Sequence, residues 1–399
     1  MKAVVVGAGI AGLVTGRQLG LAGWDVEILE KSAAPRPDGY MMDFFGPGVD
    51  ASERIGLYPR LAAAAYHIQA ADYVDERGRR TCSLDYDQFA KFAGAKVLSL
   101  LRPDMERAAL AALQDVPAGR VRVRYGAPVV RAWTDDDGAH VALDGSPEEM
   151  LTADVLVGAD GIHSQVRAGV FGPEHDYLRP LGMRAAAFIV RDPELNARFR
   201  NRFILTDTID RMAGLYSLRA DEVAAVLVYR DAEGAVRGSG SGSGTQSARE
   251  RLRREFAGLG GVVDRLLERC PEHPYDDDVA QIVMPGWQKD RAVLVGDACG
   301  AVSLLAGQGG SLAIAGAALL GDVLGPVATP DGIRPALARF EQGWRPLVEV
   351  AQESGRRAAS SFLPRNARQR LLRRWIIRAT HLPGVDRLVA HQILRRIAS

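Results

Sequence analysis

The fold is decided by residues 2–31, KAVVVGAGIAGLVTGRQLGLAGWDVEILEK. The opening KAVVV lacks the polar alternation of a half-exposed strand, which is typical of a parallel strand buried on both faces. A glycine-rich turn follows, then a helical stretch over LVTGRQLGLAG and a second strand over WDVEILEK. This order predicts a strand–helix–strand unit that opens an α/β fold with a parallel sheet.

The turn has the spacing Gly7-x-Gly9-x-x-Gly12, directly between the strand and the helix. Gly7 permits the tight turn, Gly9 lets the backbone approach a pyrophosphate, and Gly12 lets the helix pack close to the strand. Glu30 ends the second strand, where a carboxylate can bind ribose hydroxyls and would repel the 2′-phosphate of NADP. The glycine pattern alone also occurs in turns without a ligand. Strand, helix and terminal acid together predict a bound dinucleotide, either FAD or NAD.

Length, charge and cysteine content narrow the class of protein. A chain of 399 residues favours two joined domains, and a net charge of +1 gives no reason to expect a nucleic-acid partner. Cys82, Cys270 and Cys299 form no CxxC, which favours a reduced, cytoplasmic compartment. The seven histidines are scattered, so no metal site is predicted. Residues 311–327 are rich in Gly and Ala, and we expect a buried helix there, not a membrane span.

Later segments indicate two intertwined domains. Residues 72–84 predict a hairpin with its turn at Gly78, and Asp104–Gln114 predicts a helix. The β-like runs between 181 and 235 indicate a second sheet, whereas RAVLVGD at 291–297 returns to the character of a buried parallel strand. The predicted organisation is a dinucleotide-binding domain in three pieces (1–70, 98–180 and 276–345), a substrate-binding β-sheet domain (71–97 and 181–275) and C-terminal helices (346–399).

Two segments are unusual in composition. Residues 238–244 read GSGSGSG, which predicts a flexible linker, engineered or natural. The tail 365–396 contains nine arginines and one acidic residue, interleaved with apolar side chains. We expect it to pack an apolar stripe on the body of the protein with its arginines in water. A helix that faces an anionic surface or a membrane is the alternative.

Two further segments identify the dinucleotide by resemblance. DVLVGADGIHSQVR at 154–167 and VLVGDACGAVSLLAGQG at 293–309, together with the first glycine turn, resemble the three signatures of the class A flavoprotein monooxygenases. The resemblance spans about residues 1–350 and is to the para-hydroxybenzoate hydroxylase-like fold, in particular its tetracycline-modifying and polyketide-tailoring branch. It implies an α/β fold: an FAD-binding, Rossmann-like (GR2-type) domain with an inserted β-sheet substrate domain and a C-terminal helical region.

The resemblance also implies roles for single residues. The expected FAD-binding residues are Gly7, Gly9, Ala11, Gly12, Glu30, Lys31, Asp43, Arg102, Asp160, Asp297, Gly307, Gly309 and Gly310. Arg36 and Arg167 are the candidates for NAD(P)H. The substrate candidates, chosen by position alone, are Arg184, Ala187, Phe203, Met212 and Leu304. The family pattern departs at Gly300, Leu304 and Ser311, so the substrate pocket cannot be inferred from better-known members.

The implied chemistry belongs to the cofactor. NADPH or NADH would reduce non-covalently bound FAD, O2 would form a flavin C4a-hydroperoxide, and an electron-rich aromatic or polyketide-like molecule would be hydroxylated. No side chain is expected to be a catalytic nucleophile or base, and water must be excluded. Two alternatives stay open: a related flavoprotein oxidoreductase without oxygen insertion, and a flavin- or nucleotide-binding protein without turnover. Monomer and homodimer are both compatible with the sequence.

Overall fold

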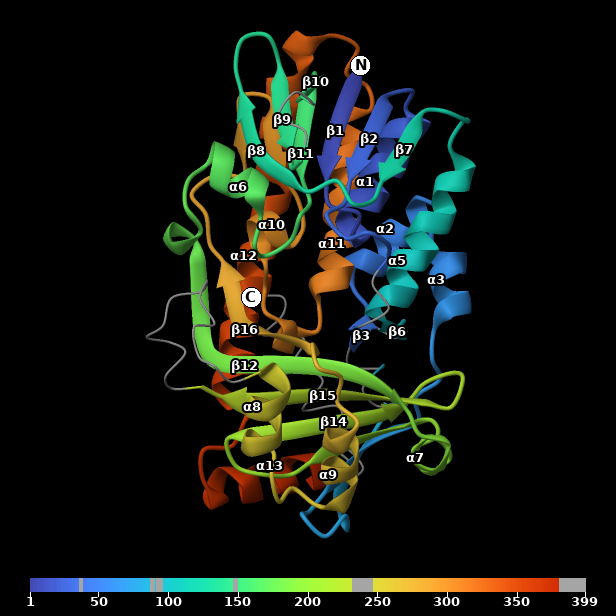
Figure 1. Cartoon of the computed structure of the whole chain (residues 1–399), viewed down its shortest axis with the longest axis vertical. Coiled ribbons are helices and arrows are strands. Elements are labelled where there is room, and N and C mark those ends of the chain that lie inside the picture. Colours follow the sequence, from blue (N-terminus) through green and yellow to red (C-terminus); the bar gives the residue numbers. More distant parts are fainter. Residues whose placement is uncertain (36–38, 87–89, 91–95, 146–149, 232–246, 380–399) are drawn as a thin grey trace.

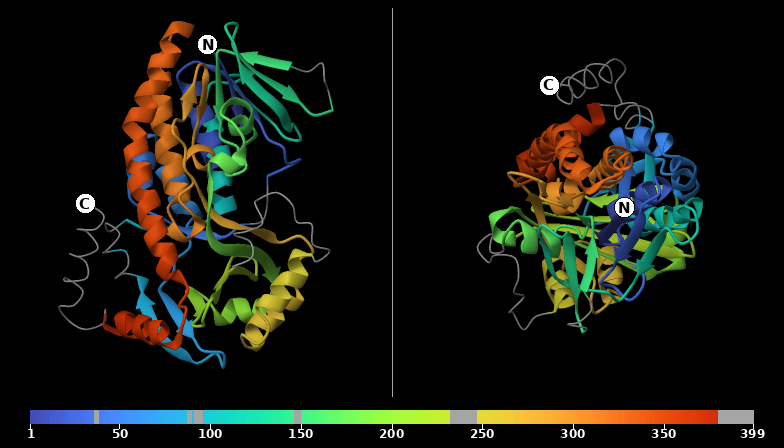
Figure 2. Two further views of the ribbon diagram at one scale, coloured as in Figure 1. Left: turned by 90° about the vertical axis from the view of Figure 1, so that its left-hand side faces the viewer. Right: turned by 90° about the horizontal axis from the view of Figure 1, so that it is seen from above.

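The structure is a computed structural model of the chain, and it describes residues 1–35, 39–86, 90, 96–145, 150–231 and 247–379. Figure 1 shows two layers of sheet, one above the other along the long axis, and the long strand β12 bends into the lower one beside β15. The helix α12 (Ile333–Phe362) extends along one side of both layers (Figure 2). The α/β fold class expected from the sequence is confirmed.

The upper layer is a six-stranded sheet that contains the N-terminal unit. β1 lies at its centre and pairs in parallel with β2 on one side and β11 on the other. Every residue of β1 after Lys2 is buried, as the uninterrupted apolar run predicts. The sheet order is β17 (Gln288–Lys289), β18 (Ala292–Leu294), β11 (Val155–Gly158), β1 (Lys2–Val6), β2 (Asp25–Leu29) and β7 (Val121–Arg124).

Helices cover this sheet and bury its apolar side chains. α1 (Ile10–Leu21) packs on α11 (Gly309–Leu324), which in turn contacts α12. α11 is buried along most of its length, which confirms the prediction for residues 311–327. No helix among the described residues is long and apolar enough to span a membrane. The smaller elements beside this layer are α2 (Pro47–Arg54), α3 (Tyr58–Ala64), α5 (Arg102–Ala111), α6 (Gln165–Val170), α10 (Asp297–Gly300), the sheet β10–β9–β8 (Met150–Ala153, Ala139–Leu143, Val129–Thr134) and the pair β3–β6 (Met41–Phe44, Leu98–Leu101).

The lower layer is a seven-stranded sheet. Its first hairpin, β4 and β5, turns at Gly78 (φ +72°), as predicted. One face packs against α8 and α9 through Phe188, Leu227 and Phe256, whereas the other face is turned toward β3, β6 and the end of α12. The order is β16 (Tyr275–Ile282), β12 (Leu178–Arg191), β15 (Glu222–Arg230), β14 (Arg211–Ser217), β13 (Arg202–Thr206), β4 (Ala70–Val74) and β5 (Arg80–Asp85), with α7 (Pro193–Arg198), α8 (Ala248–Glu255) and α9 (Gly261–Glu268) beside it.

The two sheets are built from interleaved parts of the chain. The strands of the upper sheet come from residues 2–29, 121–124, 155–158 and 288–294, and those of the lower sheet from 70–85 and 178–282. This interleaving supports the three-piece division that we propose. β16 belongs to the lower sheet, so the predicted boundary after residue 275 falls inside a strand. The Gly/Ser run 238–244 lies outside the described residues.

The C-terminal helix α13 (Ala367–Ala379) contradicts the expectation for the tail. Leu372 and Trp375 point away from the body, whereas Arg373 and Arg374 point inward and bind Asp207. Leaving a buried carboxylate without a cation costs more free energy than leaving a leucine exposed to water. The arginines therefore face Asp207, and the apolar side chains face solvent. Residues 380–399 of the tail lie outside the described part of the chain.

Candidate active site: a dinucleotide cavity between the sheets

A cavity of about 570 Å³ opens at the carboxyl ends of β1 and β2. This is the edge of a parallel sheet at which α/β proteins bind nucleotides. Segments far apart in the sequence meet here: the glycine turn, the loop after β11, the start of α5, the start of β16 and the first residue of α10. The predicted FAD-binding residues that line it are Gly7, Gly9, Glu30, Lys31, Arg102, Asp160 and Asp297.

The glycine turn leaves no room for side chains at two of its positions. Gly7 has φ +103°, and a Cβ atom there would lie 2.4 Å from the carbonyl oxygen of Ala159. A Cβ atom on Gly12 would lie 1.9 Å from the carbonyl oxygen of Gly7, which is inside any allowed contact. Gly9 begins α1 and lines the cavity, so the amino end of the helix and its positive dipole face the cavity.

Glu30 is fixed beside the turn by backbone groups. Its Oε2 accepts a hydrogen bond from the Ala8 N–H at 2.9 Å, and its Oε1 accepts one from the Ser32 N–H at 2.9 Å. A carboxylate oxygen has two lone pairs, so such a group can accept hydrogen bonds from both the backbone and a ligand hydroxyl. Lys31 follows on the same wall of the cavity.

An arginine and two acids, Arg102, Glu106 and Asp297, also line the cavity, and the first two lie beside the glycine turn. Nη2 of Arg102, at the start of α5, lies 2.9 Å from Oε1 of Glu106 one turn later. Burial raises the pKa of Asp297, and the positive charge of Arg102 opposes that rise. Burial also raises the pKa of Tyr40 to about 12, so its phenol is neutral and donates a proton in hydrogen bonds. These groups give the cavity one fixed cation and several oxygen acceptors.

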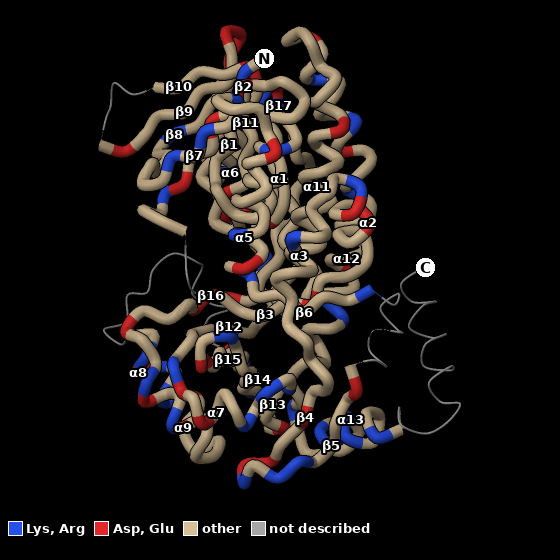
Figure 3. Tube along the Cα trace, turned by 90° about the vertical axis from the view of Figure 1, so that its right-hand side faces the viewer, with Lys and Arg blue, Asp and Glu red and all other residues tan. Residues whose placement is uncertain are grey.

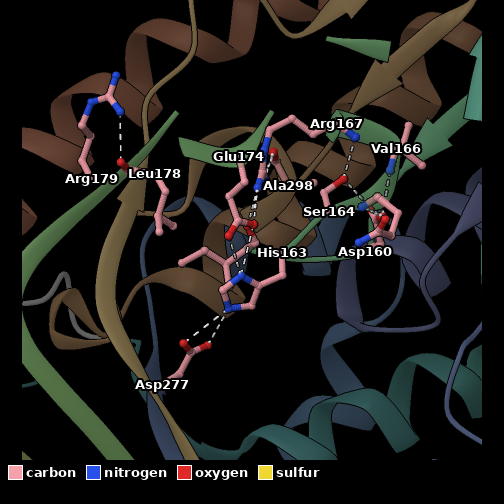
Figure 4. Close-up of polar contacts among 12 residues, drawn as sticks. Asp160, His163, Ser164, Val166, Arg167, Glu174, Leu178, Arg179, Asp277 and Ala298 are labelled. Carbon is pink, nitrogen blue, oxygen red and sulfur yellow. Dashed lines mark hydrogen bonds and ion pairs between the residues drawn. The ribbon is translucent and has the colours of Figure 1, made fainter. Parts of the chain in front are cut away.

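The loop after β11 uses its polar groups internally (Figure 4). Asp160 caps α6, since its carboxylate accepts hydrogen bonds from the Ser164 hydroxyl at 2.5 Å and the Gln165 N–H at 2.7 Å. Burial raises the pKa of Asp160, and these hydrogen bonds oppose the rise. Asp160 therefore lines the cavity and at the same time fixes the start of the helix.

Arg167, a candidate for NAD(P)H, is not among the described residues that line the cavity. Its side chain is fully buried and donates to the carbonyl oxygens of Ala298, at 2.9 Å, and Ile162, at 2.6 Å, and it forms an ion pair with Glu174 at 3.0 Å. A guanidinium with these partners holds the loop against α10 and offers nothing to a phosphate. Arg36, the other NAD(P)H candidate, lies outside the described residues.

His163 joins this loop to the lower sheet. Its Nδ1 lies 3.1 Å from Oε2 of Glu174, and its Nε2 lies 3.1 Å from Oδ2 of Asp277 on β16 (Figure 4). The hydrogen bond to Asp277 is the main cause that raises the pKa of His163 to about 9, and burial acts in the opposite direction. The imidazolium is therefore charged at neutral pH and bridges two carboxylates at the rim of the cavity.

The remaining predicted FAD-binding residues are not among the described residues that line the cavity; these are Ala11, Gly12, Asp43, Gly307, Gly309 and Gly310. Gly309 lies at the start of α11, where a Cβ atom would be 3.9 Å from Oδ1 of Asp297. Gly310 is packed so closely that its Cβ would lie 2.5 Å from Sδ of Met42. The amino end of α11 is thus next to the cavity, although these glycines do not line it.

Asp43 lies on β3 and faces the hairpin of the lower sheet. Its carboxylate accepts hydrogen bonds from the hydroxyl of Tyr86 and, at 3.1 Å, from that of Ser99. Burial raises the pKa of Asp43, and both hydrogen bonds oppose the rise. The ring of Tyr86 stacks on Phe203, with centroids 6.4 Å apart. A chain of polar and aromatic groups therefore links the two layers at this point.

The five substrate candidates divide between the two faces of the lower sheet. Met212 and Leu304 belong to one apolar cluster, and Phe203 to a neighbouring one, on the face turned toward the upper layer. Ala187 pairs with Val226, whose side chain lies in the same clusters. These four candidates share the face on which a substrate could meet a bound ring.

Arg184, the fifth candidate, is on the other face of the sheet and binds carboxylates of the protein. It pairs with Tyr229, which packs with α8 and α9. Its guanidinium forms ion pairs with Asp276 at 3.1 Å and with Asp278 at 2.7 Å, so its positive charge is balanced within the protein. The candidates were chosen by position alone, and Arg184 and Ala187 stand three residues apart on β12, so their side chains point to opposite faces of the sheet.

Several lining residues were missed at the sequence level; these are Tyr40, Glu106, Tyr125, Tyr275 and Asp277. Glu106 lies four residues after Arg102 and so on the same face of α5, but the predicted helix began only at Asp104. The others come from loops and strand ends with no local pattern. Cys299 is buried, which raises the pKa of its thiol, as expected for a packing residue and not a redox group.

Comparison with known proteins agrees with this geometry. The family model described as FAD binding domain matches residues 1–353. The chain is 34% identical over 363 residues to an uncharacterized protein, MT1298, of Mycobacterium tuberculosis (88% of this chain, 92% of that protein). It is 28% identical over 369 residues to a flavin-dependent monooxygenase of an unknown prokaryotic organism (91% and 90%). The crystal structure of the tetracycline destructase Tet(51) superposes with a TM-score of 0.79 at 23% identity, covering 99% and 96% of the two chains.

The expected recognition, fold and cofactor are therefore confirmed at the level of the family. The matched residues include the glycine turn, the loop with Asp160 and the segment with Asp297, which together surround the cavity. This protein belongs to the family of FAD-binding domain proteins.

Proposed function

We propose that this protein is an FAD-dependent monooxygenase that uses NADPH or NADH and O2 to hydroxylate a small aromatic or polyketide-like molecule. The observation that carries the proposal is that the glycine turn, Glu30, Arg102 and Asp297 all line one cavity, next to the amino end of α11. A relative named as a flavin-dependent monooxygenase and a fold neighbour named for tetracycline support the reaction class and the size of substrate.

The residues present fit FAD. Gly7 and Gly12 carry no Cβ atom, and the turn has no space for one at either position. We propose that the backbone at the amino end of α1 is therefore accessible to a pyrophosphate. We propose that Glu30 binds the adenosine ribose, and that Arg102 and Asp297 bind the central part of the cofactor. When bound, FAD would supply hydride acceptance from NAD(P)H and the activation of O2.

The side chains of the protein would position the reactants and exclude water. The helix dipole at the amino end of α11, beside Asp297, favours negative charge on a group bound there. The apolar face of the lower sheet, with Phe203 and Met212, would keep the reacting ring dry. We propose Ala187, Phe203, Met212 and Leu304 as the substrate wall, because they share that face.

The substrate is expected to be flat and to carry oxygen substituents. Phe203 lies 4.8 Å from the ring of Tyr216 and stacks with Tyr86, and we propose that a flat ring packs beside this aromatic cluster. The hydroxyl of Ser99 and the carboxyl of Asp43, whose pKa burial raises, offer polar partners at the edge of these rings. A phenol or a related heteroaromatic ring satisfies both kinds of group.

We also propose a cytoplasmic location. The three cysteines are all free thiols and all buried, which fits a reduced compartment.

One experiment tests the function directly. The purified protein is heated to release its cofactor, which is identified by chromatography, and NADPH or NADH oxidation in air is then measured with a panel of phenols and heteroaromatics. We expect FAD, substrate-stimulated oxidation and a product heavier by one oxygen atom that comes from labelled O2. Oxidation without oxygen in the product, after correction for hydrogen peroxide, would indicate an oxidoreductase without oxygen insertion. Bound FAD without stimulated oxidation would indicate a binding protein.

A further inference from the structure

The helix α13 presents its apolar side chains to solvent. Leu371, Leu372, Trp375 and Ile376 are 50%, 60%, 69% and 55% exposed, and we call these four residues the apolar face of α13. Their spacing of one, three and four residues places them on one side of the helix. Other exposed large apolar residues are spread singly or in pairs over several elements, whereas these four are contiguous.

The orientation of α13 is fixed by its opposite, charged side. Arg373 and Arg374 both bind the fully buried carboxylate of Asp207, the former at 2.6 Å. The guanidinium of Arg373 also lies 5.2 Å from the ring centroid of Tyr73, and Arg378 donates to the carbonyl oxygen of Thr81 at 2.7 Å. Turning the apolar face inward would leave Asp207 buried without these partners, which is strongly unfavourable. The apolar face therefore stays outside.

The charges around the face indicate what can cover it. Residues 365–379 contain six arginines and no acidic residue, and Figure 3 shows this basic stretch beside β5. Arg365 and Arg368 are exposed, and no described residue forms an ion pair with either. Two copies of the protein that met through this face would bring these arginines together, so a second copy is disfavoured by like charge. The partner must be apolar and anionic at once.

We propose that the apolar face of α13 docks on the surface of an anionic lipid bilayer, with the helix parallel to the membrane plane. Leucine, isoleucine and tryptophan side chains enter the boundary between headgroups and acyl chains, and Trp375, the most exposed of the four, suits that depth. Arg365 and Arg368 bind lipid phosphates or carboxylates. Four side chains and two free cations give weak, reversible attachment, with no insertion across the bilayer.

Vesicle sedimentation tests the proposal without reference to enzyme activity. The full-length protein is mixed with vesicles of phosphatidylcholine alone, or of phosphatidylcholine with an equal part of phosphatidylglycerol, and the pelleted fraction is measured. We expect pelleting with the anionic vesicles and little with the neutral ones. Raising the ionic strength to about 0.5 M should release most of the bound protein, since the charges are then screened within a few ångströms.

Variants separate the apolar and the cationic contributions. Leu372→Ser with Trp375→Ser should weaken binding at least about ten-fold, because two apolar side chains no longer leave water. Arg368→Gln should weaken it about five-fold, as expected for one cation near an anionic surface. Val350→Ser is the matched control, since Val350 is 50% exposed on α12 and lies outside the face. Trp375→Phe should keep binding but lose quenching of protein fluorescence by brominated lipid.

The other outcomes overturn the proposal. Equal binding to neutral vesicles would mean that the arginines do not contribute. Absence of binding together with a dimer that Trp375→Ser dissociates, as measured by analytical ultracentrifugation, would assign the face to a second copy. Binding only by a protein that ends at Ala379 would mean that residues 380–399 cover the face. None of these outcomes would contradict the proposed hydroxylation, because no residue of α13 lines the cavity.

Discussion

Replacement of His163 by glutamine should destabilise the protein in a way that depends on pH. Glutamine keeps a hydrogen-bonding side chain but not the positive charge that bridges Glu174 and Asp277. The pKa of His163 is raised from 6.5 to about 9, so the charge contributes fully below pH 6.5 and is lost as the pH rises through 9. The variant should therefore be less stable than the parent at pH 6.5 and equal to it above about pH 9.5.

The size of the effect follows from the geometry. A rise of this size would correspond to about 3 kcal/mol for a group shielded from water. The His163 side chain is 45% exposed, so solvent screening reduces the contribution to about 1 kcal/mol. In a domain of this size that is a fall in Tm of about 2 °C. The difference should also shrink in high salt, because an exposed bridge is screened.

Urea unfolding of the FAD-saturated protein at pH 6.5 and at pH 9.5 is the appropriate assay, with the same excess of FAD throughout. His175→Gln is the matched control: its side chain is 81% exposed, and its one ion pair among the described residues is with Asp176 at 3.4 Å. It should change stability by much less at both pH values. A loss for His163→Gln that is equal at the two pH values would refute the charged bridge, and no loss at pH 6.5 would refute the bridge altogether.

Three further substitutions test other parts of the structure. Gly12→Ala places a Cβ atom 1.9 Å from the Gly7 carbonyl oxygen, so the purified variant should retain little FAD by absorbance, whereas Gly261→Ala, with no atom within 4 Å, should retain it fully. Arg102→Gln removes the charge that opposes the raised pKa of Asp297, and it should weaken FAD binding about ten-fold in a fluorescence titration. Arg334→Gln is the surface control. An unchanged affinity for FAD in Arg102→Gln would exclude Arg102 from the site. Asp207→Asn leaves Arg373 and Arg374 without their carboxylate and should cost about 3 kcal/mol or expose α13 to limited proteolysis, and a variant as stable and as resistant as the parent would contradict the anchoring of α13.

The parts of the fold that could be predicted from the sequence are those set by local rules. The βαβ unit, the turn at Gly78 and the buried α11 each follow from periodicity and from glycine positions within a short window. The glycine turn and Glu30 were found for the same reason, and the structure brings both to one cavity. These predictions hold because strand pairing and helix packing reinforce the local preference.

Residues that reach the cavity through contacts between distant parts of the sequence could not be predicted. Tyr275 and Asp277 reach the cavity only because β16 pairs with β12, about ninety positions away in the sequence. His163 bridges two acids, but only the folded structure shows that Asp277 lies within 3.1 Å of it. Which face of β12 is turned toward the cavity depends on the bulge beside Gly182, whose φ of +72° no periodicity reveals.

Three arginines have carboxylate partners that no motif in the sequence indicates. Arg167 was assigned to a cofactor, Arg184 to a substrate and Arg373 to solvent, yet each binds a carboxylate of the protein. The carboxylates that bind Arg184 and Arg373 come from distant parts of the chain. A partly buried guanidinium is stable only with such a partner, and the partner decides where the side chain points. The composition already indicates such pairing, because the chain has 49 acidic residues and 50 basic ones. In a chain so balanced, an arginine that is not explained by a motif is better assigned to an internal ion pair than to a ligand.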